Sequence, residues 1–292
     1  MANAITLAKQ FVPILDEIYK LASLTSKLDG NPDLVRAGAN ANELIIPKLT
    51  MQGLGAYSRN SGYVSGDVTL TNETISCNFD RGRMFTVDYM DDLETAGIAF
   101  GRLAGEFIRT KVVPELDAFR FATYCGITGI STVAGAALSA GADVISALRA
   151  ATNKMDEDEV PYEDRHLFIT PTLMGLVQDL DTTKSKEVLS RFASTTLVPQ
   201  TRFYTAIDQY DGTTSGETAG GYVKDATSGK NINFMVIQKS ALIQFEKHVA
   251  PKIITPEMNQ TADAYKFGYR NVGIADAYEN KVAGIYLHKS TT

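Results

Sequence analysis

Histidine and cysteine are the residue types of this chain best suited to metal binding or nucleophilic catalysis, but their spacing favours neither. His166, His248 and His288 lie far apart, and Cys77 and Cys125 fall in unrelated segments. Sequence motifs for such sites bring these groups together at short spacing, as in His-Glu-x-x-His or Cys-x-x-Cys. We therefore expect structural roles for the histidines, and two reduced cysteines without a disulfide.

Two glycine-containing segments partly match phosphate-binding motifs, but neither completes its motif. A phosphate loop ends in Gly-Lys followed by Ser or Thr, so that backbone N–H groups surround the phosphate. Here the residues are Gly229-Lys230-Asn231, and Lys224 occupies the position of the first glycine. The segment Gly126-Ile-Thr-Gly129 lacks the first half of a dinucleotide fingerprint, and a loop or tight packing is favoured there.

The acidic run at residues 156–159 could attract a divalent cation, but Val160-Pro161 replaces the glycine turn and the downstream glutamate of a calcium loop. A solvated loop is the favoured interpretation. No serine lies in a Gly-x-Ser-x-Gly elbow either. The sequence thus predicts no catalytic, cofactor-binding or metal-binding residues, and we expect a protein that is not an enzyme.

The composition is typical of a soluble globular protein, with 44% hydrophobic and 21% charged residues. We find no apolar run long enough for a transmembrane helix and no signal peptide, so we expect no membrane contact and synthesis in a cytoplasm. The formal net charge of -6 and the pI near 5.2 argue against a dedicated nucleic-acid binder. Affinity for a phosphate backbone depends on clustered Lys and Arg.

Residues 43–92 are predicted to form a long two-stranded hairpin with too little apolar surface for a core of its own. An extended run starts at Ile45, turn residues occupy 57–67, and the chain returns from Val68 with alternating character. Isolated two-stranded ribbons are marginally stable in water. We expect the hairpin to dock on a neighbouring molecule, which indicates an assembly protein.

Residues 4–24 are predicted to form an amphipathic helical arm that is detachable from any core. Pro13 is expected to kink or divide this helix, and Asp29-Gly-Asn-Pro32 is a strong stop before the hairpin. The apolar residues recur at helical spacing, and they are Leu7, Ala8, Phe11, Leu15, Ile18 and Ala22.

After the hairpin, Met90-Asp-Asp92 signals a helix start, and helical periodicity runs from Ile98 to Thr123 with Pro114 inside it. The periodicity is compatible with one long, bent spine helix and equally with two helices that meet at a turn. The rest of the chain predicts a mixed α and β fold. We expect a loop at 125–141, helices at 143–154 and 173–179, and strands at 165–171, 201–207, 234–238 and 282–288.

The order of these segments resembles the major capsid proteins of tailed bacteriophages, which have the Hong Kong 97-like fold, across nearly the whole chain. Residues 45–49 and 85–92 resemble that family's extended E-loop, and residues 112–121 resemble the end of its spine helix. Residues 165–174 are similar to the entry into its axial domain, and 264–273 to its returning peripheral segment.

The resemblance implies an α+β fold with a fixed order of parts along the chain. These are an N-arm (1–42), an E-loop hairpin (43–90), a spine helix with the peripheral domain (91–164), an axial domain (165–255) and a returning peripheral segment (256–292).

The same resemblance implies a shell of pentamers and hexamers, the head of a tailed phage, assembled in the cytoplasm of a bacterial host. Its partners would be a portal, a separate scaffold or a decoration protein, and packaged double-stranded DNA bound without sequence specificity. The predicted subunit-interface residues are Phe11, Leu15 and Ile18 in the arm, and Tyr57, Arg59, Asn60, Tyr63 and Asp67 in the hairpin.

Two departures from relatives in that family refine the expectation. The hairpin begins near Glu43, which leaves no room for a preceding scaffolding segment and implies a separate scaffold or none. The tip from Ala56 to Asp67 has no lysine, and Lys48 lies at the hairpin base, so covalent cross-linking through an E-loop lysine is not expected. Two alternatives stay open: an encapsulin-type nanocompartment shell, and an unrelated enzyme whose site assembles from distant residues.

Overall fold

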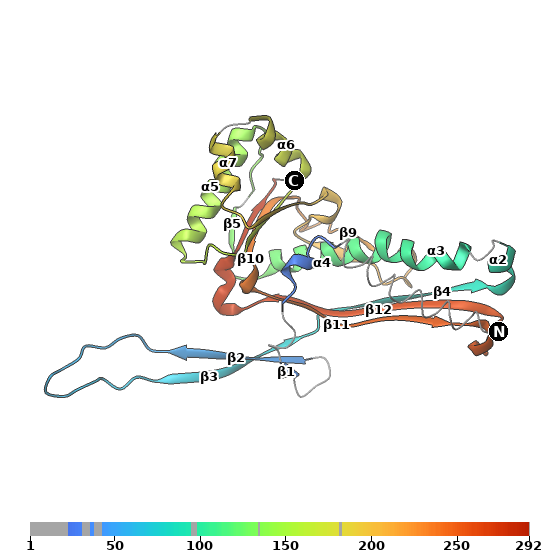
Figure 1. The fold of residues 1–292 in the computed structure, drawn as a ribbon, viewed down its shortest axis with the longest axis horizontal. Helices are drawn as coiled ribbons and strands as arrows, with labels where there is room; N and C mark the ends of the chain where they lie inside the picture. The colour runs from blue at the N-terminus through green and yellow to red at the C-terminus, as the bar shows by residue number, and fades with distance from the viewer. Residues whose placement is uncertain are drawn as a thin grey trace.

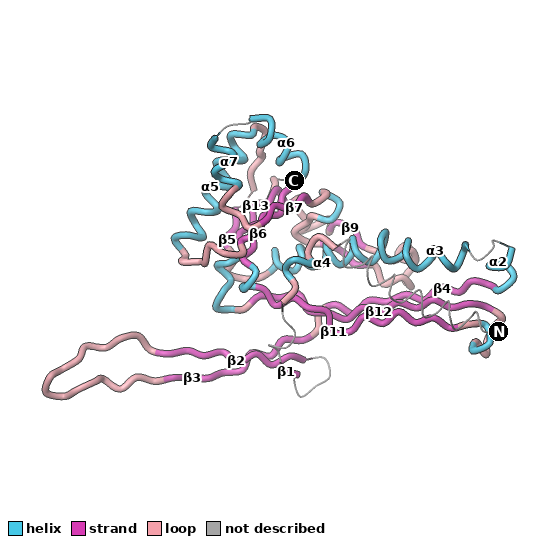
Figure 2. The backbone as a smooth tube through the Cα atoms, viewed as in Figure 1, coloured by secondary structure: helices cyan, strands magenta, loops and turns pink. Residues whose placement is uncertain are grey.

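The computed structural model describes residues 23–30, 36–37, 43–94, 98–133, 135–180 and 183–291. In these ranges a long helix lies along a three-stranded sheet, and a five-stranded sheet with its own helices stands at one end of that pair (Figure 1). A ribbon of two long strands projects from the same end, away from the rest of the chain (Figure 2). None of the helices in the described ranges is long and apolar enough to cross a bilayer.

The long helix runs without a break from Ile98 to Gly126. It consists of α3 (Ile98–Phe107), a π-helical turn (Ile108–Val112) and α4 (Val113–Gly126). Of the two arrangements that the periodicity allowed, the structure therefore has the single long helix. Pro114 is accommodated because it lies in the first turn of α4, where a missing N–H removes little intrahelical bonding, directly after the π-helical turn.

The three-stranded sheet beneath this helix is antiparallel, in the order β11 (Leu242–Ile254), β12 (Ala264–Ala277) and β4 (Phe79–Asp88). Its aromatic side chains Phe79, Phe267 and Tyr269 pack against Ile108 and Leu116 of the helix. Short helix α2 (Tyr89–Glu94) follows β4 at the far end of the sheet.

The five-stranded sheet has the order β5 (Ser131–Val133), β13 (Ile285–Lys289), β10 (Ile232–Gln238), β6 (Arg165–Ile169) and β7 (Ser194–Leu197). One face packs on α5 (Gly141–Glu157), α6 (Pro171–Leu180) and α7 (Thr183–Leu189). The other face, with Phe168 and Met235, packs on Phe121 and Tyr124 of α4. Strand β6 is buried along its whole length because both faces are covered.

The projecting ribbon is formed by β2 (Glu43–Met51) and β3 (Val68–Ser76), with the two-residue strand β1 (Arg36–Ala37) beside β2. The predicted hairpin is confirmed over these strands, but its predicted extent of 43–90 is too long. Strand β4 leaves the ribbon and pairs with β12, from Asp88 opposite Ala264 to Phe79 opposite Gly273. Between β3 and β4, the side chain of Asn78 bonds both the N–H and the carbonyl of Ala275, at 3.1 and 2.7 Å.

The sheets also cross the boundaries that the sequence predicted at 164/165 and 255/256. Strand β11 belongs with β12 and β4, β13 closes the five-stranded sheet, and α5 packs on that sheet although it precedes residue 165. Pairing between strands distant in sequence leaves no mark on local periodicity. The strand predicted at 201–207 is wrong for most of its length, because Pro199 starts a turn of 3₁₀-helix, Gln200–Arg202, and strand β8 begins only at Ile207.

Part of the predicted arm belongs to the core. Leu28 is 1% exposed and packs among the residues between α4 and the five-stranded sheet. The detachable arm was expected over residues 4–24, and this expectation is wrong for Ser23 and Leu24, the two of them that the structure describes, because Ser23 is buried and Leu24 packs against the same core. The predicted helix at 4–24, with Phe11, Leu15 and Ile18, lies outside the described residues except for its last two positions.

Candidate inter-subunit surface

The distal half of the ribbon carries much of the exposed apolar surface of the described residues. Eight of their sixteen exposed large hydrophobic side chains lie between residues 49 and 70. They are Leu49, Met51, Leu54, Tyr57, Tyr63, Val64, Val68 and Leu70. Such clustering is typical of an interaction surface, since single scattered apolar side chains are ordinary but contiguous ones are not.

Four of these side chains form one stripe on a single face of the ribbon. Leu49 pairs with Leu70 and Met51 with Val68, so the register places all four on the same side. Their exposed fractions are 52%, 67%, 64% and 68% in that order. Full burial of side chains of this size stabilises by about 1.5–3 kcal/mol each. We call Leu49, Met51, Val68 and Leu70 the distal apolar stripe.

The tip of the ribbon is held in a defined shape by its own contacts. Ser58 and Gly62 exchange backbone hydrogen bonds of 3.2 and 2.8 Å, and the Ser58 hydroxyl accepts from the N–H groups of Asn60 and Ser61. Gly62 has a φ of +77°, which favours glycine at this turn. The rings of Tyr57 and Tyr63 meet edge to face with centroids 4.9 Å apart. A preformed tip loses less conformational entropy when it binds.

The base of the ribbon is attached to the body by an apolar contact and an ion pair. Ile46 and Ile75 pack against Ile243 and Ile274, where β11 and β12 begin and end. Lys48 forms an ion pair with Glu279, which follows β12. These contacts hold the base of the ribbon, while the stripe beyond them remains exposed.

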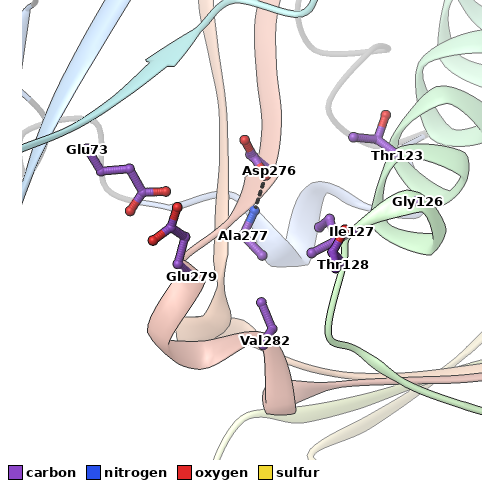
Figure 3. A pocket seen from close by; sticks show the side chains of 9 residues that line it. All are labelled: Glu73, Thr123, Gly126, Ile127, Thr128, Asp276, Ala277, Glu279 and Val282. Atoms are coloured by element: carbon purple, nitrogen blue, oxygen red, sulfur yellow. Dashed lines mark hydrogen bonds between the residues drawn. The ribbon is translucent and has the colours of Figure 1, made fainter.

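The carboxylates of Glu73 and Glu279 face each other beside this attachment, and Asp276, which accepts a hydrogen bond from the N–H of Ala277, lies nearby. Glu73 of the ribbon lies close to Glu279 and Asp276 of the body, along a pocket of about 500 Å³ (Figure 3). Burial raises the pKa of Glu73 and the charges of Glu279 and Asp276 raise it further, while the charge of Lys48 acts in the opposite direction without reversing the shift. Burial also raises the pKa of Asp276. At neutral pH this like-charge cluster opposes the attachment that Lys48 makes.

Replacing Glu73 by glutamine is therefore expected to raise the thermal stability at pH 7. A carboxyl with a raised pKa in the folded state destabilises that state when ionised, and the penalty disappears as the pH falls through its folded pKa toward its unfolded value of about 4.3. The gain from Glu73→Gln should therefore vanish near pH 4. Melting curves between pH 4 and 8 measure it.

Asp80→Asn provides the control of opposite sign, because a hydrogen bond from Arg270 lowers the pKa of Asp80. Asp80→Asn should lower the thermal stability at pH 7. This loss of stability should shrink as the pH falls through the unfolded pKa of Asp80 toward its lowered folded value. Equal melting temperatures of the unsubstituted chain and Glu73→Gln at pH 7 would contradict the role given to the cluster.

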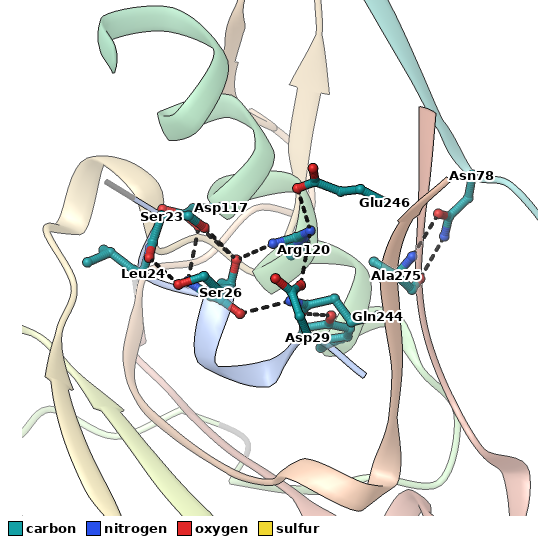
Figure 4. Close-up of polar contacts among 12 residues, drawn as sticks. Ser23, Leu24, Ser26, Asp29, Asn78, Asp117, Arg120, Gln244, Glu246 and Ala275 are labelled. Atoms are coloured by element: carbon teal, nitrogen blue, oxygen red, sulfur yellow. Dashed lines mark hydrogen bonds and ion pairs between the residues drawn. The ribbon is translucent and has the colours of Figure 1, made fainter. Parts of the chain in front are cut away.

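A buried polar network fixes residues 23–30 against α4 (Figure 4). Asp117, which is fully buried, accepts hydrogen bonds from the hydroxyls of Ser23 and Thr25 at 3.0 and 2.8 Å and from the N–H of Leu24. One turn further along α4, Arg120 donates to the hydroxyl of Thr25 at 2.8 Å and to Glu246 at 3.2 Å. Residues 23–25 are thereby tied to the long helix.

The residues singled out for chemistry take part in packing and local hydrogen bonds. His166 contacts the Ser194 hydroxyl at 2.8 Å, His288 stacks on Phe234, and burial lowers the pKa of both histidines. Burial raises the pKa of the Cys125 thiol, which disfavours the reactive thiolate. Within the described ranges, no three His, Cys, Asp or Glu side chains are placed to hold a metal ion together.

No protein-family model matches the chain, and no curated protein matches it in sequence. Its structure nevertheless matches solved structures over most of its length. A structure from Gordonia phage Cozz has a TM-score of 0.61 at 12% identity, and covers 92% of this chain and 87% of its own. The capsid of Myoviridae phage XM1 has a TM-score of 0.53 at 13% identity, and covers 92% of both chains. The chain has the Hong Kong 97-like capsid fold.

A virus-like particle from Pyrococcus furiosus also shares this capsid fold, with a TM-score of 0.55 at 10% identity and coverage of 94% of this chain and 95% of its own. We name the ribbon of β2 and β3 the E-loop and the helix from Ile98 to Gly126 the spine helix, after the parts of the capsid fold that they resemble.

The E-loop brings together four of the predicted interface residues. Tyr57, Arg59, Asn60 and Tyr63 lie at its exposed tip, whereas Asp67 lies at the neck, where its N–H donates to the side chain of Gln52. The distal apolar stripe was missed. The alternation Leu49-x-Met51 opposite Val68-x-Leu70 would have revealed it, once the strand register was fixed at the Leu49–Leu70 pair.

Proposed function

We propose that the chain is the major capsid protein of a tailed bacteriophage. It self-assembles into pentamers and hexamers, and these form the icosahedral head shell around the double-stranded DNA genome. The observation that carries this proposal is the distal apolar stripe on an E-loop that projects beyond its own subunit. In a chain with the capsid fold, a second copy is the partner able to cover that stripe.

Within this proposal, the three-stranded sheet and spine helix form the peripheral domain, and the five-stranded sheet with α5, α6 and α7 forms the axial domain. The E-loop tip residues and the arm residues Phe11, Leu15 and Ile18 contact neighbouring subunits. Further partners are a portal, and a separate scaffold or decoration protein. The net charge of -6 favours packaged DNA that is enclosed without sequence-specific binding. The protein then resides in the virion after assembly in the cytoplasm of its bacterial host.

An encapsulin-type nanocompartment shell is the second candidate. The match to the Pyrococcus furiosus virus-like particle, at a similar TM-score and over slightly more of the chain, favours it. Both candidates use the same subunit surfaces and differ in what the shell encloses.

Electron microscopy of the purified, full-length chain tests the shared part of the proposal. We expect closed particles with five-fold and six-fold rings, because head-to-tail contacts close into cyclic assemblies. A chain that stays monomeric at high concentration, with and without candidate scaffold proteins from its source, would contradict shell formation. Particles from the natural source then separate the candidates: nuclease-protected duplex DNA and a portal indicate the phage shell, and an enclosed enzyme indicates the nanocompartment.

A further inference from the structure

A small hairpin crosses from the five-stranded sheet to the three-stranded sheet. It consists of β8 (Ile207–Gln209), a loop at 210–221 and β9 (Tyr222–Lys224), and the chain enters and leaves it on the side of the five-stranded sheet. Its loop lies against β4 of the other sheet. Two short strands alone are marginally stable, so this hairpin depends on what holds its loop.

Two arginines of β4 hold the loop by its backbone. Arg83 donates to the carbonyls of Thr218 and Ala219, at 2.9 and 3.1 Å. Arg81 donates to the carbonyl of Tyr210 at 2.7 Å, on the other arm of the loop. Because Arg81 and Arg83 are two residues apart on one strand, both side chains point to the same face and reach both arms.

A third element joins at the same place. Glu115 of the spine helix accepts from Arg81 Nε at 2.7 Å and from Gln209 Nε2 at 3.3 Å, so β4, β8 and the spine helix meet at one carboxylate. Burial raises the pKa of Glu115, although the neighbouring Arg81 acts in the opposite direction. The contact is thus an ionic and hydrogen-bonded junction that is largely removed from solvent.

Beneath the loop lies a cavity of about 560 Å³ between β4 and the spine helix, lined in part by Phe85 and Phe107. The loop therefore rests on hydrogen bonds around a cavity more than on tightly packed side chains. Hydrogen bonds can be exchanged for water and remade, whereas a close-packed core resists deformation.

We propose that residues 207–224 act as a releasable strap that locks the five-stranded sheet against strand β4 and the spine helix. Gly220 fits this role, because its φ is +66° and a Cβ atom there would lie 2.7 Å from Arg83 Nη1. An alanine there would be strained by the positive φ and would push the flexible end of the Arg83 side chain aside. The strap is a property of the single subunit and does not depend on shell formation.

Hydrogen–deuterium exchange on the unassembled, full-length chain tests the strap. Arg83→Met removes the two donors, and Gly220→Ala disturbs the same contact from the loop side while it keeps both arginines. We expect exchange in residues 210–221 to rise about tenfold or more in both variants, with residues 232–238 of β10 unchanged. Arg270→Met is the matched control, because Arg270 pairs with Asp80 on the opposite face of the same sheet.

Unchanged exchange at 210–221 in both variants would overturn the proposal. So would an equal rise in β10, since Arg83 would then support the whole fold. In assembled particles, which rest on the proposed function, a released strap should broaden the distribution of diameters. The exchange result remains valid if no particles form, so failure of the strap and failure of the shell proposal can be told apart.

Discussion

Replacing Arg120 by methionine is expected to lower the free energy of unfolding by about 3 kcal/mol, the lower end of the range for removal of one partner from a buried ion pair, because its partners Glu246 and Asp29 are 19% and 43% exposed. The side chain of Arg120 is 2% exposed and pairs with Glu246 at 3.2 Å and with Asp29 at 3.5 Å. Methionine fills a similar volume without the charge, so Glu246 and the Thr25 hydroxyl lose a donor inside the protein. The melting temperature should fall by roughly 10 °C.

Arg109→Met is the matched control on the same helix. Arg109 also pairs with a carboxylate, Glu106, but the two side chains are 60% and 57% exposed. Exposed pairs contribute about 0–1 kcal/mol. Urea unfolding of both variants compares the two losses directly, and equal losses would show that residues 23–30 are not held by this network. Exchange in residues 23–30 should rise in Arg120→Met alone.

Local features of this fold could be predicted from its sequence, because they depend on neighbouring residues. The buried strand at 165–169 is flanked by turn residues, and the periodicity from Ile98 extends over the whole spine helix. The partners of the strands could not be predicted. Nothing near Leu242 or Ile285 records that β11 joins β4 and β12, or that β13 joins the five-stranded sheet.

In the candidate site too, local features could be predicted from the sequence and long-range contacts could not. The hairpin and its glycine-rich tip follow from turn chemistry, so Tyr57, Arg59 and Tyr63 could be placed together. The position of Asp117 and Arg120 beside residues 23–30 could not, since the groups involved are more than ninety residues apart along the chain. The strap likewise depends on Arg81 and Arg83, whose carbonyl partners have no side-chain signature at all.

The double substitution of Leu49 and Leu70 by aspartate is expected to leave a folded subunit that forms no shell. Both side chains are more than half exposed, so the subunit loses little core packing. An assembled shell would bury both charges without partners, at a cost of several kcal/mol for each contact. Circular dichroism and melting curves report the fold, and size-exclusion chromatography with electron microscopy reports the particles.

Thr50 and Thr69 provide the control, because they also face each other across β2 and β3 but point to the opposite side of the E-loop. Thr50→Asp with Thr69→Asp introduces the same two charges at the same depth of the ribbon. We expect this variant to assemble. If both double variants assemble equally, the distal apolar stripe is an ordinary surface and the central interpretation of the E-loop is wrong.

Deletion of residues 58–66 distinguishes the contribution of the tip to assembly from that of the distal apolar stripe. It removes the Tyr57–Tyr63 ring contact and the turn at Gly62, and retains Leu49, Met51, Val68 and Leu70. The sequence places the docking contacts at the polar tip, which predicts a folded subunit without a stable shell. The structure adds an apolar contact further down the ribbon. Particles of normal size but lower melting temperature would assign cohesion chiefly to the stripe, because apolar burial contributes more per side chain than exposed polar contacts do.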